Sequence, residues 1–181
     1  MTKGKLSVHD LCFIGIFTAI ITVLGQIAIP MPYGVPMTLQ TLTIPLAGVI
    51  LGAKKGTYAT LAYVFLGALG IPVFAGYTGG LSIVIGPTGG FILSFPIMAL
   101  TAGIGAEKEK PIWVISGLII GSIINYLCGM FMFSVITSCD LRAAFVACVL
   151  PFIPTAMIKI ILSWVLGTSI RKVLVKGKIL V

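Results

Sequence analysis

Residues 71–96 read IPVFAGYTGGLSIVIGPTGGFILSFP, and they place two glycine clusters inside a chain of long apolar runs. The first cluster, 75–80, predicts a turn, because glycine adopts positive φ angles that other residues avoid. The second, Gly86-Pro-Thr-Gly-Gly90, interrupts a run that otherwise favours a helix. In lipid, irregular backbone persists only where protein or a wet cavity satisfies its N–H and C=O groups. A broken helix therefore predicts a cavity here, where bare backbone approaches a ligand.

Two interpretations of the second cluster remain open. Small residues also let membrane helices pack closely, and a single glycine would be explained in that way. Five adjacent residues that include Pro87 and the Thr88 hydroxyl favour a ligand site instead. A phosphate-binding loop does not match, because Phe91-Ile92 follows the last glycine, where Lys-Ser or Lys-Thr is required.

Composition places this stretch in a membrane protein. The 181 residues are 59% hydrophobic and 9% charged, and the mean hydropathy is +1.20. Soluble domains carry about a quarter charged residues, and apolar runs of about 20 residues are typical of membrane spans. The net charge of +8 comes from basic residues between the apolar runs. Membrane topology explains this charge, and no nucleic-acid partner is expected.

The sequence has few residues that could catalyse a reaction or bind a metal ion. The four cysteines have no metal-ligand spacing, no carboxylates are paired, and His9 is the only histidine. We therefore expect no enzyme activity, no cofactor and no metal. The chain also lacks an ATP-binding motif, so uphill transport would need energy from an ion gradient or from another subunit.

The apolar runs predict an all-α integral membrane protein of six transmembrane helices, folded as a single domain over residues 1–181. The expected spans are 11–29, 37–53, 56–74, 81–106, 111–137 and 143–170. Ser7, three residues before Asp10, predicts a capping box at the start of the first helix. Three prolines within 30–36 predict a loop, because proline removes a backbone donor and restricts its neighbours.

The basic residues predict the orientation of these spans. With six spans, ten of the twelve lysines and arginines fall on the side of the two termini. Only Arg142 falls on the other side, and Lys159 lies within a span. The positive-inside rule then places both termini in the cytoplasm. The loop 30–36, the turn 75–80 and the loop at Asp140 would face outward, where they could close over a cavity.

Lys159 is the only basic residue within an expected span. A lysine at the centre of a membrane helix costs roughly 2.5–3.5 kcal/mol, so it usually has a partner or a function. The side chain could reach the outer surface by extending along the helix. However, no aspartate or glutamate occurs in the second to sixth spans. We favour an anionic or strongly hydrogen-bonding ligand as the partner of Lys159.

Three further polar side chains complete a possible site. Gln40 lies in an unusually polar first turn of the second span, Thr88 lies in the broken span, and Asn125 lies inside the fifth span. Each alone is weak evidence, because buried amides also join helices through hydrogen bonds. With Lys159, they predict a mostly apolar pocket that has few polar groups, which is the usual form of a small-molecule site.

Several motifs resemble the BioY family, the biotin-binding S components of energy-coupling factor (ECF) transporters, over most of the chain. These motifs are Val35-Pro-Met-Thr-Leu-Gln-Thr41, Leu46-Ala-Gly-Val-Ile-Leu-Gly52, Gly70-Ile-Pro-Val-Phe-Ala-Gly76, and Gly79-Gly-Leu through Gly86-Pro-Thr-Gly-Gly-Phe91. The resemblance implies a compact six-helix protein of the prokaryotic plasma membrane that captures biotin from outside. It also implies a transmembrane coupling protein and two ABC-type ATPases as partners.

The resemblance also implies which residues form the site. Those that fall where the family builds its pocket are Thr38, Gln40, Tyr77 in the loop 76–80, Gly86, Thr88, Gly89 and Lys159. In the first span, Gly15 and Ala19 form a small-xxx-small face suited to close helix packing. This face resembles the alanine-rich motif with which S components contact the coupling protein, although glycine replaces the first alanine.

One position departs from the family pattern. Family members commonly carry aspartate three residues before the lysine, in Pro-Gly-Asp-Leu-Ile-Lys, whereas this chain reads Pro154-Thr-Ala-Met-Ile-Lys159. Asn125 is the candidate to supply the polar group that Ala156 cannot. With this departure, an S component for another vitamin or for a biotin precursor is an alternative. A solitary transporter without ATPases and a non-transporting membrane assembly factor are two further hypotheses.

Overall fold

The computed structural model describes residues 6–31 and 34–180. Lys3 and Lys5, two of the basic residues used for orientation, and positions 32–33 of the expected proline-rich loop lie outside these ranges. The described residues form eight α-helices, a short 3-10 helix and a two-stranded hairpin. The elements are α1 (Val8–Gly25), β1 (Ala28–Ile29), β2 (Met37–Thr38), α2 (Gln40–Leu51), α3 (Ala53–Ala68), α4 (Leu81–Val84), α5 (Gly89–Glu107), α6 (Pro111–Thr137), α7 (Leu141–Cys148), η2 (Leu150–Phe152) and α8 (Ile153–Lys176).

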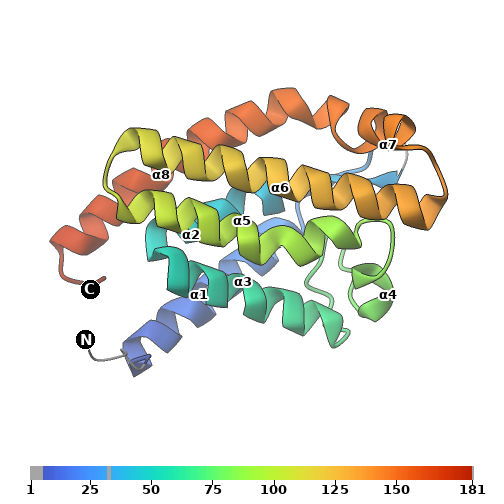
Figure 1. The fold of residues 1–181 in the computed structure, drawn as a ribbon. Helices are drawn as coiled ribbons and strands as arrows, with labels where there is room; N and C mark the ends of the chain where they lie inside the picture. The colour runs from blue at the N-terminus through green and yellow to red at the C-terminus, as the bar shows by residue number, and fades with distance from the viewer. Residues whose placement is uncertain (1–5, 32–33, 181) are drawn as a thin grey trace.

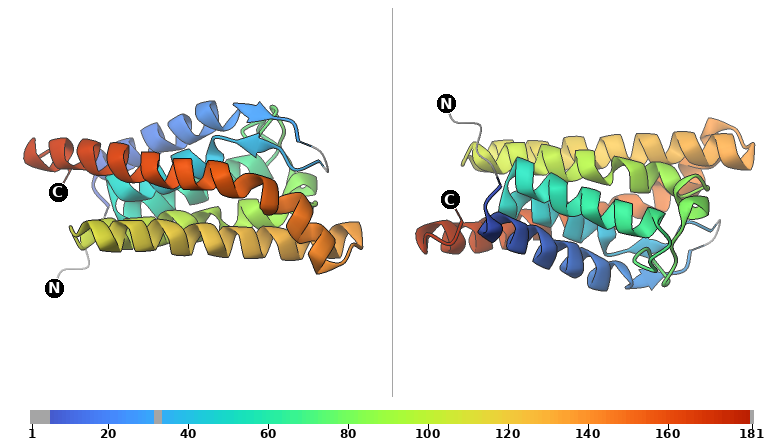
Figure 2. Two further views of the ribbon diagram at one scale, coloured as in Figure 1. Left: turned by 90° about the horizontal axis from the view of Figure 1, so that it is seen from above. Right: turned by 90° about the horizontal axis from the view of Figure 1, so that it is seen from below.

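The helices form an elongated bundle around α2. Nine of the twelve residues of α2 are buried, and this helix packs against α1, α3, α5 and α8. The start of α1 and the end of α8 lie at the same end of the bundle (Figure 1). Figure 2 shows the hairpin, α4 and α7 at the opposite end. The irregular segments therefore gather at one end, at the start of α2.

Membrane-spanning character is clear for four helical stretches of the described chain. These stretches, Val8–Gly25, Gly89–Glu107, Pro111–Thr137 and Leu141–Lys176, are long and apolar enough to cross a bilayer. The central helix α2 is apolar but has only 12 residues. The expectation of an all-helical membrane protein is thereby confirmed at the level of fold class.

The first helix begins as predicted and ends earlier. The Asp10 N–H donates to Ser7 Oγ at 3.1 Å and the Ser7 N–H donates to Asp10 Oδ2 at 3.0 Å, which confirms the capping box. Helix α1 ends at Gly25 instead of continuing to residue 29. Ala28 and Ile29 instead pair with Thr38 and Met37 in an antiparallel hairpin. The reason is local, because Ile29 precedes Pro30 and a residue before proline favours extended backbone.

The two glycine clusters have the predicted local structure. Helix α4 ends at Val84 and α5 begins at Gly89, so the break in this apolar run is confirmed. The cluster 75–80 is a turn, in which Phe74 and Thr78 form an isolated bridge. Positive φ angles occur there at Gly76 (68°) and Gly80 (106°), and also at Tyr77 (58°), where a side chain makes this conformation unfavourable.

The last apolar run differs most from the expected helix. Between residues 141 and 176 it forms α7, η2 and α8 in place of one span over 143–170. The interruption coincides with Pro151 in η2, and Pro154 lies in the first turn of α8. Proline lacks a backbone N–H, so it fits best in the first turn of a helix, where no hydrogen bond within the helix is lost. The chain therefore changes direction before α8 runs the length of the bundle.

A polar cluster joins five helices, α1, α2, α3, α5 and α8, around Gly52, the residue between α2 and α3, where φ is 86°. At the end of α2, Arg171 Nη1 donates to the carbonyl oxygens of Ile50 at 2.9 Å and Val49 at 3.4 Å. At the start of α3, Glu107 Oε1 accepts from the Ala53 N–H at 2.8 Å. A cation thus meets the carbonyl end of one helix and an anion meets the amide end of the next.

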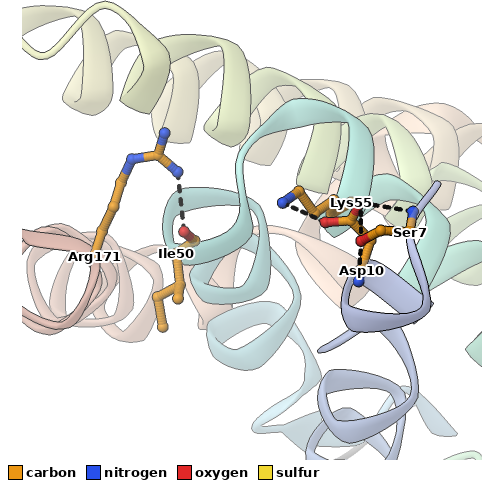
Figure 3. A network of polar contacts seen from close by, with 5 residues as sticks. All are labelled: Ser7, Asp10, Ile50, Lys55 and Arg171. Carbon is orange, nitrogen blue, oxygen red and sulfur yellow. Dashed lines mark hydrogen bonds and ion pairs between the residues drawn. The ribbon is translucent and has the colours of Figure 1, made fainter. Parts of the chain in front are cut away.

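The same cluster includes an ion pair between α3 and α1. Lys55 Nζ lies 2.7 Å from Asp10 Oδ1, and Asp10 also accepts from Ser7 (Figure 3). Figure 3 shows Arg171 reaching Ile50 beside this pair. We call Asp10, Lys55, Glu107 and Arg171 the Gly52 cluster. It fixes the bundle end that is opposite to the hairpin.

Candidate functional site

A cavity of about 240 Å³ lies at the hairpin end of the bundle. Its wall is mostly apolar, and it is formed by the start of α2, the 74–78 turn, the α4–α5 break and the helices α5 to α8. The lining residues are Gly34, Val35, Pro36, Thr38, Gln40, Thr41, Phe74, Ala75, Thr78, Ile83, Thr88, Phe91, Ile92, Phe95, Tyr126, Cys148, Phe152 and Lys159. A concave, mostly apolar space with a few polar groups suits a small organic molecule.

Lys159 supplies the positive charge of this cavity. Its Nζ donates to the Thr38 carbonyl oxygen at 2.7 Å and to Thr41 Oγ1 at 2.9 Å. An ammonium group has three donors, so one remains for a ligand. Among residues 6–31 and 34–180, no carboxylate forms an ion pair with Lys159. The side chain is held against the start of α2 inside the bundle, where it lines the cavity.

A chain of buried hydrogen bonds fixes the two other polar groups at the start of α2. Thr38 Oγ1 donates to Gln40 Oε1 at 2.8 Å, and Gln40 Nε2 donates to the Tyr63 hydroxyl at 2.6 Å. The Tyr63 hydroxyl in turn donates to the Val73 carbonyl oxygen at 3.1 Å. Thr38 and Gln40 both line the cavity. Their positions are therefore set by the protein before any ligand binds.

Asn125 lies beside the main cavity and not on its wall. The side chain is 1% exposed, and its Nδ2 donates to the Phe91 carbonyl oxygen at 2.9 Å and to Ser94 Oγ at 2.8 Å. Both amide hydrogens are used to join α6 to α5, which leaves only the carbonyl oxygen for another partner. Asn125 lines a second cavity of about 10 Å³, together with Thr41, Ala156 and Lys159 among others.

Of the expected residues in the broken helix, only Thr88 lines the main cavity. A Cβ added at Gly89 would lie 1.9 Å from the Val84 carbonyl oxygen, and one at Gly90 would lie 2.1 Å from that of Cys128. These two glycines therefore allow close backbone packing, as in the alternative interpretation. Gly86 approaches the Ser82 carbonyl oxygen and is not a lining residue.

Tyr77 also lies outside the cavity wall. Its side chain is 75% exposed, whereas its neighbours Ala75 and Thr78 line the cavity. The Tyr77 N–H donates to Gln26 Oε1 at 2.8 Å. Its contribution to the site is therefore made through the backbone of the turn.

The aromatic wall was not expected from the sequence. Phe74, Phe91 and Tyr126 line the cavity, and Phe91 and Tyr126 meet edge to face with ring centroids 6.4 Å apart. Aromatic residues are common throughout apolar membrane runs, so their type alone does not mark a site. One signal was available, because Phe91 directly follows the second glycine cluster and Tyr126 directly follows Asn125.

Gly15 and Ala19 lie far from the cavity, on the exposed face of α1. A Cβ added at Gly15 would meet no atom within 4 Å. The opposite face of α1 is buried at Ile14, Thr18 and Ile21. The small-residue face of α1 is thus free of other helices of this chain, as far as the described residues extend.

Together, the fold and the cavity define a multi-pass helical membrane protein with an internal space of small-molecule size. A model of the BioY family matches residues 1–176. Among curated relatives, a biotin transporter BioY of Thermotoga maritima is 37% identical and covers 87% of this chain and 93% of its own. A biotin transporter BioY of Rhodobacter capsulatus is 35% identical over 91% of this chain and 94% of its own. The chain belongs to the BioY family.

A solved structure supports the same conclusion at the level of the fold. The crystal structure of the S-component for biotin from an ECF-type ABC transporter has a TM-score of 0.84 to this chain at 29% identity. The match covers 91% of this chain and 92% of the other. The resemblance expected from the sequence motifs is therefore confirmed.

Proposed function

We propose that this protein captures biotin in the cavity of about 240 Å³, as the substrate-specificity subunit of an ATP-driven uptake transporter. The observation that carries the proposal is the Lys159 ammonium, which pairs with no carboxylate of the described residues and lines a mostly apolar cavity. The relatives are named as biotin transporters or as a component of one, which agrees with the expectation that the chain is not an enzyme.

Biotin has the groups that this cavity can accommodate. Its fused rings and thioether suit the wall formed by Phe74, Phe91 and Tyr126. Its ureido group needs donors and acceptors of the kind that Thr38 and Gln40 provide, and its carboxylate or ureido oxygen can accept from Lys159. The proposed binding residues remain Thr38, Gln40, Thr88 and Lys159 on the wall, with Asn125 beside it.

We propose a structural role for Gly86, Gly89 and Tyr77. Gly86 and Gly89 allow the helix break that places Thr88 at the cavity, and Tyr77 contributes through its backbone N–H. These residues support the site without touching the ligand.

The proposal includes six membrane spans with both termini in the cytoplasm. Support comes from the start of α1 and the end of α8, which lie at one end of the bundle (Figure 1). Lys54 and Lys55, in the first turn of α3, lie at this end, and so do Lys108 and Lys110 between α5 and α6. The cavity would then open toward the outside. In this arrangement α2 and α3 are short spans, and α4 with α5 forms the broken one.

We further propose that a transmembrane coupling protein binds the small-residue face of α1, and that two ABC-type ATPases supply the energy. The support for the first partner is the exposure of Gly15 and Ala19 on a helix of the outer layer. Small residues permit close approach of a second helix in a membrane. The ATPases are proposed because the chain has no ATP-binding motif of its own.

A biotin precursor is the second candidate ligand. The observation that favours it is the cavity of about 10 Å³ beside Ala156 and Asn125, which lies where a longer side chain at 156 would supply another polar contact. Biotin and dethiobiotin both carry a ureido group, but dethiobiotin lacks the thioether ring.

The test is calorimetric titration of both ligands into the purified protein in detergent. Tight one-to-one binding of biotin, with weaker binding of dethiobiotin, supports the proposal. Tighter binding of dethiobiotin would favour the precursor, and binding of neither would refute the capture role.

A further inference from the structure

Gln26 joins the end of α1 to the loop that precedes α4. It is the C-cap residue of α1, and its side chain makes three hydrogen bonds to this loop. Gln26 Nε2 donates to the carbonyl oxygens of Pro72 at 3.3 Å and Val73 at 3.0 Å, and Gln26 Oε1 accepts from the Tyr77 N–H at 2.8 Å. The donors and the acceptor of this one amide group thus all form hydrogen bonds to a segment about 50 residues later in the sequence.

This segment forms one wall of the cavity. Phe74, Ala75 and Thr78 line it, and Phe74 is 1% exposed and packs edge to face on Tyr63. The bonds made by Gln26 bracket these lining residues, because they fall on Pro72 and Val73 before them and on Tyr77 among them. Displacement of the loop from α1 would therefore move the wall as a unit.

The turn itself needs external support. Gly76 and Tyr77 adopt φ angles of 68° and 58°, and the second is unfavourable for a residue with a Cβ. The Gln26 amide oxygen accepts from the N–H of Tyr77, so it stabilises the backbone where the conformation is least favourable. Gln26 does not line the cavity, so it acts on a ligand only through this loop.

We propose that Gln26 is a positioning residue for ligand retention, which holds the 72–78 wall against the cavity. The inference rests on the proposed function, since the retained ligand is taken to be biotin. The 72–78 segment forms part of the wall around a partly open cavity, and movement of this segment away from the cavity breaks the bonds to Gln26 and widens the way out for a ligand. Loss of these bonds should therefore raise the dissociation rate more than it changes the association rate.

Two substitutions distinguish the hydrogen bonds that the Gln26 side chain donates from the one that it accepts. Gln26→Glu keeps the size of the side chain and the acceptor for the Tyr77 N–H, but it loses both donors and places a carboxylate beside two carbonyl oxygens. Gln26→Ala removes all three bonds. Thr22→Val is the matched control, because it lies about one turn earlier on α1 and loses only the bond from Thr22 Oγ1 to the Thr18 carbonyl oxygen at 2.9 Å.

Dissociation is measured by chasing bound radiolabelled biotin with unlabelled biotin, and loop position is measured by amide hydrogen exchange of the peptide that covers 72–78. We expect roughly tenfold faster dissociation in both Gln26 variants, which corresponds to the loss of one or two ordinary hydrogen bonds. We also expect faster exchange in 72–78 without biotin. The Thr22→Val protein should match the wild type in both measurements.

Wild-type dissociation in both Gln26 variants would overturn the proposal. An equal effect of Thr22→Val would also overturn it, because the cause would then be a general weakening of α1. If the wild type itself binds no biotin, the proposed function fails, and hydrogen exchange in 72–78 still decides whether Gln26 positions the wall.

Discussion

The ammonium of Lys159 lies 2.7 Å from the carbonyl oxygen of Thr38, a residue 121 positions earlier in the chain. Thr38 is the last residue of β2, so its carbonyl lies where the hairpin leads into α2. The contact directs a long flexible side chain along the cavity wall and leaves one donor free. It joins the cation to the backbone without neutralising it.

Lys159→Met retains most of the length of the side chain and removes its charge. Hydrogen bonds to charged groups contribute about 1.5–3 kcal/mol, so we expect biotin affinity to fall about 10- to 150-fold. Calorimetric titration measures this change. Lys110→Met, at an exposed position between α5 and α6, removes the same charge away from the cavity and should bind as the wild type does. Equal affinity in the Lys159 variant would show that the lysine serves only to hold α8 against α2.

Tyr63→Phe removes the hydroxyl that joins Gln40 to the Val73 carbonyl. The Gln40 amide and the Val73 carbonyl then lack the hydroxyl as a hydrogen-bond partner in the bundle interior. This loss should lower the free energy of unfolding by about 1–3 kcal/mol. Thermal unfolding in detergent should show lower stability, and biotin affinity should fall because the Gln40 side chain is then held only by Thr38. Tyr58→Phe is the control at a partly exposed tyrosine of the same helix. A Tyr63 variant with the stability of Tyr58→Phe would contradict the role given to the network.

Gly90→Ala places a methyl group where α5 touches α6. The added Cβ would lie 2.1 Å from the Cys128 carbonyl oxygen, which is backbone and cannot rotate away. We expect the two helices to separate locally and stability to fall by about 1–3 kcal/mol, as in other overpacked interiors. Gly15→Ala is the comparison, since nothing lies within 4 Å of its added Cβ and alanine favours a helix. If both variants unfold at the wild-type temperature, the packing interpretation of Gly90 is wrong.

Gly15→Leu tests the proposed coupling surface. The site is open in the isolated chain, so folding and biotin binding should be unchanged. A leucine there would prevent close approach of a second helix, and we expect at least a tenfold loss of the coupling protein in co-purification. Ala143→Leu enlarges an exposed small residue on α7 and should leave assembly intact. If the Gly15 variant still assembles fully, the coupling protein does not bind at this face of α1.

Local features of the fold were predictable from the sequence. Pro87 lies between glycines in an apolar run, and no helix continues through such a cluster, so the break could be predicted without knowledge of the neighbours. The importance of Lys159 could also be predicted, because the second to sixth spans hold no acidic partner. The hairpin was missed because its strands have two residues each, too few for any periodic pattern.

Contacts between distant segments were not predictable in the same way. The amide of Asn125 points to Phe91 and Ser94 only because α5 and α6 pack in one particular register. Gln26 was overlooked for a similar reason, since a single amide at a helix end is common and its partners lie near residue 75. These assignments depend on tertiary packing, which the order of residue types along one segment does not specify.

The hydrogen bonds from α8 to both ends of α2 also set an order of events during biosynthesis. Lys159 and Arg171 reach carbonyl oxygens of residues made 121 positions earlier, so α2 is synthesised long before its partners. At about 5–20 residues per second the delay is roughly 6–24 s. Over that time the carbonyl oxygens of Thr38 and Ile50 must find other donors, such as water, lipid headgroups or the insertion machinery. The cavity and the Gly52 cluster are therefore completed in the same late step, when α8 joins the bundle.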